Sequence, residues 1–163
     1  MPRILAPAVL AFALAAGLSL PARGELAKWD QEKVAGLAKQ LNDAANNLYS
    51  TFYKQPPPQA GSGQSTAYRK LKQKMRRIQM EARELDRELA KGDSREDSQD
   101  VYDNLMQLVR DASIDARSVF TTADVQSAAS AARQILNQIS PYYDPDAQPL
   151  QSQQRTESVK PAK

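Results

Sequence analysis

Residues 68–89 carry the most restrictive feature of the sequence, an unbroken heptad repeat of apolar side chains. Its members are Tyr68, Leu71, Met75, Ile78, Ala82, Leu85 and Leu89. Steps of three and four residues place all of them on one face of an α-helix, whereas a β-strand would change face at every residue. Burying each large apolar side chain stabilises a fold by ~1.5–3 kcal/mol. We therefore expect this helix to pack against other helices along its whole length.

Three further segments have apolar side chains at helical spacing. The expected helices span about residues 30–53, 66–91, 94–120 and 122–140. Asp30 is a suitable N-cap for the first helix, and Gly92 a suitable end for the second. Asp93 could cap the third, with Glu96 three residues later resembling a capping box. The connection after Phe120 contains neither Gly nor Pro, so the last two helices are either separate or one kinked helix.

These helices predict an all-α domain over residues 25–141, arranged as an up-down-up-down antiparallel four-helix bundle. The heptads are also compatible with a homo-oligomer of coiled-coil type, because they do not fix oligomeric state. Residues 142–163 are rich in Pro, Gln, Ser and Asp, which predicts a disordered C-terminal tail. Tyr142 and Tyr143 are expected to pack on the end of the bundle; the alternative is a short docking motif.

Residues 1–24 have the features of a secretory signal peptide. Arg3 supplies positive charge, and an uncharged apolar stretch follows it. Ala22 and Gly24 are small residues suitably spaced for cleavage before Glu25, and cleavage after Ala22 is the alternative. An uncleaved anchor is disfavoured because the apolar stretch is short for a bilayer. We expect an extracytoplasmic, periplasmic protein that is soluble after cleavage and has no integral membrane span.

The basic balance of the chain does not predict nucleic-acid binding. The sequence has 22 basic and 19 acidic side chains, a net charge of +3. Arg3 and Arg23 fall in the predicted signal peptide and no acid precedes Glu25, so 20 basic and 19 acidic residues remain, a net of +1. A nearly neutral mature chain lacks the overall positive charge that attracts DNA or RNA.

The sequence contains no cysteine and no histidine. It therefore lacks disulfides, thiolate ligands, a cysteine nucleophile, and both the commonest general base and the commonest metal ligand. No serine–lysine motif stands out as a substitute catalytic pair. We accordingly predict that the protein is not an enzyme and that it has no metal or other cofactor.

A cluster of basic residues near the start of the second helix is the candidate binding site. Its members are Arg69, Lys70, Lys72, Lys74, Arg76 and Arg77. Positive charge at a helix N-terminus opposes the helix dipole, and a locally unfavourable cluster sometimes marks a binding site. The expected partner is a protein or an anionic component of the cell envelope. The alternative is a solvated face neutralised by acids on neighbouring helices.

In outline, the chain resembles small exported helical bundles. Periplasmic cytochromes share the signal peptide and four helices, but their haem needs a histidine ligand that is absent here. Periplasmic helical stress chaperones are similar in size and helicity, although their recurring Leu-Thr-x-x-Gln signature is absent. The resemblance covers architecture alone and carries over no site residue.

Two functions fit these observations. The first is a non-enzymatic exported interaction protein of adaptor, chaperone-like or envelope-associated type, using the basic cluster. The alternative is a carrier that holds a small apolar ligand within the bundle core. The Ala-rich face of the fourth helix could leave space between helices, and a cavity of a few hundred Å³ would support this alternative.

Overall fold

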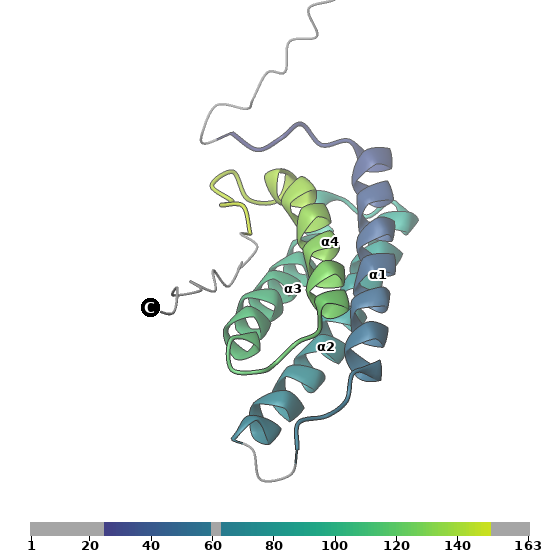
Figure 1. Cartoon of the computed structure of the whole chain (residues 1–163). Coiled ribbons are helices and arrows are strands. Elements are labelled where there is room, and N and C mark those ends of the chain that lie inside the picture. The colour runs from purple at the N-terminus through teal and green to yellow at the C-terminus, as the bar shows by residue number, and fades with distance from the viewer. Residues whose placement is uncertain (1–24, 60–62, 151–163) are drawn as a thin grey trace, which may run out of the picture.

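The computed structural model of the protein describes residues 25–59 and 63–150, and their regular structure is entirely helical. Four α-helices follow one another: α1 (Gln31–Lys54), α2 (Gln64–Lys91), α3 (Arg95–Ala116) and α4 (Ala123–Ile139) (Figure 1). A short 3-10 helix, η1 (Ser140–Tyr142), follows α4 directly. The predicted all-α class is confirmed. The predicted signal peptide, residues 1–24, lies outside the described residues.

The first helix and the end of the second follow the predicted local chemistry. The Asp30 carboxylate accepts a hydrogen bond from the Lys33 amide at 3.1 Å and so caps α1. Gly92 ends α2 with a φ of 94°, a left-handed conformation that costs glycine little because it has no Cβ. The tight turn that follows makes α2 and α3 an antiparallel hairpin.

The capping box of α3 begins one residue later than predicted. The Asp93 amide donates to the Glu88 carbonyl at 3.2 Å, so Asp93 belongs to the closing turn of α2. Ser94 is the N-cap instead, and its hydroxyl accepts from the Asp97 amide. The Asp97 carboxylate in turn accepts hydrogen bonds from the Ser94 hydroxyl and the Ser94 amide. These two bonds, the hydroxyl's first, lower the pKa of the Asp97 carboxyl group.

The third and fourth helices are separate. Helix α3 ends at Ala116, earlier than the predicted residue 120. Val119 lies buried in the intervening loop, whereas Phe120 is 69% exposed. Thr122 then caps α4, since its hydroxyl accepts from the Val125 amide at 3.4 Å.

Successive helices run antiparallel, but the bundle is not closed evenly. Helix α1 packs closely against α2 and α4, and α2 packs closely against α3. Among the described residues, α3 and α4 do not form a close helix pair of this kind. In Figure 1 the loop between them crosses the lower part of the molecule from the end of α3 to the start of α4. The spatial order is therefore α3, α2, α1 and α4.

The heptad of α2 forms the centre of the core. All its members are buried, as predicted: Tyr68, Leu71, Met75, Ile78, Ala82, Leu85 and Leu89. Phe52 of α1 stacks on Tyr68 with a ring-centroid distance of 5.1 Å. On α4, Leu136 is buried, whereas Ile135 is only partly buried and packs against the edge of the core. Within the described residues, no helix has the length and apolar composition needed to cross a membrane.

An aromatic cluster closes the end of the bundle where α3 begins and α4 ends. Tyr142 and Tyr143 are buried, which agrees with the predicted packing role. Tyr143 stacks on Tyr102 at 4.2 Å, meets Trp29 edge-on at 5.5 Å, and its hydroxyl is 2.8 Å from that of Ser98. Burial raises the pKa of Tyr143 to about 12. Residues 142–150 of the predicted tail thus have defined contacts, and residues 151–163 lie outside the described residues.

Candidate functional site

A cavity of about 1520 Å³ lies between α3 and α4, where the bundle is not closed. All four helices contribute to its lining, together with the loop between α3 and α4 and the segment 144–150. Ligand pockets in proteins commonly measure about 300–1,000 Å³, so this cavity is large enough for a sizeable molecule. We call it the α3–α4 cavity.

The floor of the α3–α4 cavity is the hydrophobic core itself. Leu41 and Leu48 of α1 line it, as do Leu71, Met75 and Ile78 from the heptad of α2. Each of these side chains is less than 9% exposed. A fourth helix packed evenly on both neighbours would cover such a surface completely. Here it borders the cavity, and the more accessible apolar side chains of the lining are those of α3, α4 and the loop between them, Ile114 and Phe120 among them.

The two walls of the cavity differ in side-chain size. Leu105 and Val109 stand on the α3 wall, whereas Ala129, Ser130 and Ala132 stand on the α4 wall. Small side chains do not reach across to α3, so α4 can lie close to α1 and still leave space on its other side. The Ala-rich composition of this helix had predicted space between helices, and the cavity lies on that side of α4.

Arg133 of α4 is a charged residue of the cavity wall. It is partly buried, and its Nε atom is buried without a hydrogen-bond partner. Desolvation lowers the pKa of this guanidinium from its ordinary value. Among the described residues it forms no salt bridge. A desolvated cation without a partner is unfavourable, and an anion beside it would relieve that cost.

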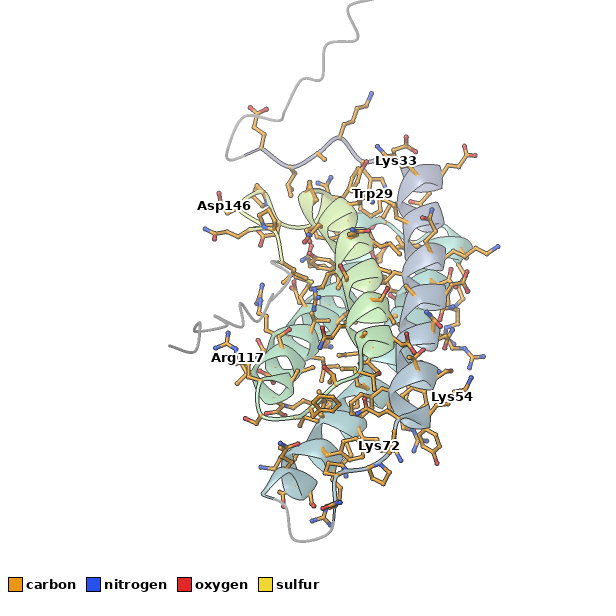
Figure 2. All side chains as sticks on the ribbon, in the orientation of Figure 1. Trp29, Lys33, Lys54, Lys72, Arg117 and Asp146 are labelled. Atoms are coloured by element: carbon orange, nitrogen blue, oxygen red, sulfur yellow. The ribbon has the colours of Figure 1, made fainter. Side chains whose placement is uncertain are left out.

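Other charged groups lie around the same cavity. Arg110 and Arg117 line it from α3 and its C-terminal end, and Asp144 and Asp146 line it from the segment after η1. Figure 2 shows Arg117 and Asp146 on the same side of the molecule. The border is therefore mixed in charge, with basic groups on the helical side.

Two large apolar side chains at the cavity are exposed. Ile114 on α3 is 61% exposed and Phe120 in the following loop is 69% exposed, and both belong to the cavity lining. Ile114 stands off the apolar stripe of its helix, so its pattern gave a weak signal of a contact surface. Exposed apolar groups beside a cavity are typical of ligand-binding or interaction sites.

The segment 144–150 is attached to α4 beside the cavity. The Leu150 amide donates to the side-chain oxygen of Asn137 at 2.8 Å, and the Asn137 amide group donates to the Leu150 carbonyl at 3.4 Å. Leu150 also packs against the core. These contacts hold the segment as one border of the cavity.

The basic cluster predicted from the sequence divides into two sets. Lys74 forms a salt bridge with Asp115 of α3 at 2.8 Å, and the Lys72 ammonium lies 3.8 Å from the centre of the Tyr53 ring. These two lysines therefore join α2 to its neighbours. The other members are exposed and do not line the α3–α4 cavity: Arg69, Lys70, Arg76 and Arg77. Figure 2 places Lys72 at the end of the molecule opposite Trp29.

The sequence pattern does not predict Arg133 as a site residue. Its position beside the apolar stripe of α4 was the available signal, but stripe position alone cannot distinguish a cavity wall from an ordinary helix edge. Within residues 25–59 and 63–150, no three acidic side chains gather into a group that could hold a metal ion. The described residues thus form an open cavity between α3 and α4 and a separate exposed basic face on α2.

Comparisons with protein-family models, with curated proteins and with solved structures find no match to this chain.

Proposed function

We propose that the protein is a non-enzymatic binding protein that carries an apolar or amphipathic molecule in the α3–α4 cavity. The observation that carries this proposal is the cavity itself, whose deepest lining comes from apolar side chains of α1 and α2, among them Leu71, Met75 and Ile78. A preformed concave site that combines apolar groups with polar and charged groups at its border suits an amphipathic molecule. The predicted signal peptide supports an extracytoplasmic, periplasmic carrier.

A substitution that fills the cavity tests the proposal. Ala129→Phe places a large side chain in the lining of the cavity, whereas Ala131→Phe adds the same side chain at an exposed position of α4 outside the lining. We expect A129F to weaken binding of the neutral apolar dye N-phenyl-1-naphthylamine about tenfold or more, and A131F to leave it unchanged. Dye fluorescence measures both, and circular dichroism verifies that each variant is helical.

The carrier proposal would be contradicted if the parent chain failed to bind the dye. Equal dye affinity in the parent and A129F proteins would also contradict it, because binding would then lie elsewhere.

A second proposal concerns the exposed part of the basic cluster. Arg69, Lys70, Arg76 and Arg77 are exposed on α2, and Met80, one turn after Arg76 and Arg77, is an apolar side chain that is 60% exposed. Cations around an exposed apolar group suit an anionic partner in the envelope, such as acidic lipid headgroups.

Neutralising those four residues to glutamine should reduce recovery with vesicles of phosphatidylglycerol in a flotation assay. The same vesicles made of phosphatidylcholine are the control, and added salt should weaken the interaction because it screens exposed charges. Unchanged recovery with the acidic vesicles would refute a role for this face.

A further inference from the structure

We propose that the molecule held in the α3–α4 cavity is a long-chain amphiphile with an anionic headgroup, its chain on the apolar floor and its headgroup beside Arg133. This inference rests on the proposed carrier function and goes beyond it by naming the ligand class. Three features of the cavity support it: the state of Arg133, the shape of the floor, and the exposed side chains at the border.

Arg133 supplies the argument for an anion. Its Nε atom is buried without a hydrogen-bond partner. Asp144 and Asp146 line the same cavity, yet neither forms a salt bridge with Arg133 among the residues that the structure describes. A guanidinium group can bind a carboxylate or phosphate through two parallel hydrogen bonds, which are stronger than bonds between neutral groups. A neutral ligand would bury Arg133 further and leave it uncompensated.

The cavity floor supplies the argument for a long chain. The lining on α3 runs from Leu105 to Ala116, which corresponds to about 17 Å along a helix axis at 1.5 Å per residue. Leu41 and Leu48 extend the apolar lining along α1, and Leu71 to Ile78 extend it along α2. A cavity of this length suits a hydrocarbon chain better than a compact ring system.

The border supplies the third argument. Ile114 and Phe120 line the cavity and are largely exposed, so they can cover the part of a chain that projects beyond the floor. Covering them would remove apolar surface from water, which favours binding.

The test compares two ligands that differ only in the headgroup. Oleate and oleyl alcohol are titrated into the full mature chain by displacement of N-phenyl-1-naphthylamine, below the concentrations at which oleate aggregates. The parent protein should bind oleate about tenfold more tightly than oleyl alcohol, as expected for one charge-assisted contact. Arg133→Gln should remove this difference, chiefly by weakening oleate binding. Arg133→Lys keeps the charge and should retain part of the preference for oleate.

Arg83→Gln is the matched control, since Arg83 is exposed on α2 and does not line the cavity. It should bind both ligands as the parent does. Circular dichroism establishes that each variant is helical. If R133Q does not fold, R133K is the test, and it should show a smaller preference for oleate than the parent protein.

The outcomes separate the two proposals. If both ligands bind equally and R133Q changes nothing, the anionic-headgroup inference is overturned while the carrier function stands. If neither ligand binds the parent chain, both are overturned. Self-association of the ligand-free chain that is abolished by Phe120→Ser would assign the cavity to a second copy of the protein and overturn the inference.

Discussion

Tyr143 joins three parts of the chain through one side chain. It stacks on Tyr102 of α3, contacts Trp29 before α1, and lies after η1 at the end of α4. Its hydroxyl and that of Ser98, which is fully buried, are hydrogen-bonded. Sequence composition placed Tyr143 in a polar C-terminal region, and its burial was foreseen only from the general tendency of aromatic side chains to pack. The identity of its partners depends on three-dimensional proximity that periodicity does not encode.

Because the pKa of Tyr143 is raised, the free energy of unfolding should fall with increasing pH in the alkaline range. The pKa is about 12 in the folded protein, against about 10 in an unfolded chain. Between these values the unfolded chain loses the proton first, so stability is intact below pH 10 and declines as pH rises toward 12. Tyr143→Phe should show a shallower decline over this range. Urea unfolding followed by circular dichroism at several pH values measures it, and equal slopes for the two proteins would contradict this account.

The helices themselves are the part of the fold that the sequence predicts best. Heptad spacing identifies which face of α2 is buried, because the period of the apolar residues matches the geometry of the helix. Boundaries are less well determined, since the third helix ends at Ala116 rather than residue 120 and its cap is Ser94 rather than Asp93. Competition between neighbouring capping residues decides such positions, and several candidates in a row satisfy the same sequence rule.

Replacing either of two glycines by alanine should change the stability of the protein, in opposite directions. Gly92 has a φ of 94° at the end of α2, whereas Gly36 lies inside α1. A Cβ at either position would meet nothing within 4 Å, so backbone conformation decides both effects. Gly92→Ala should destabilise the protein by about 1 kcal/mol, because alanine disfavours the left-handed region. Gly36→Ala should stabilise it by about 0.5–1 kcal/mol. Chemical denaturation of both variants tests the pair, and destabilisation by G36A would contradict the expected gain in helix propensity.

At the scale of the whole molecule, the important feature is an interface that is missing between two helices. Four apolar stripes predict four packed helices, but they do not state how completely each stripe is covered. The Ala-rich face of α4 predicted space, whereas the size of the cavity follows from how α4 sits on α1. The role of Arg133 could not be derived from its sequence position, because only the packed structure leaves its Nε buried without a partner. The proposed function therefore rests on incomplete packing, whose extent helical periodicity does not reveal.

Methyl NMR with a spin-labelled ligand tests the central claim most directly, that the α3–α4 cavity holds the chain of an amphiphile. The ligand is stearate with a nitroxide near the end of its chain, added to the full mature protein. The account predicts strong broadening of the methyl signals of Leu48, Leu71 and Ile78 on the cavity floor. Leu85 and Leu89 are equally buried but lie outside the cavity lining, and their signals should broaden much less. Uniform broadening of all core methyls, or none at all, would contradict the account.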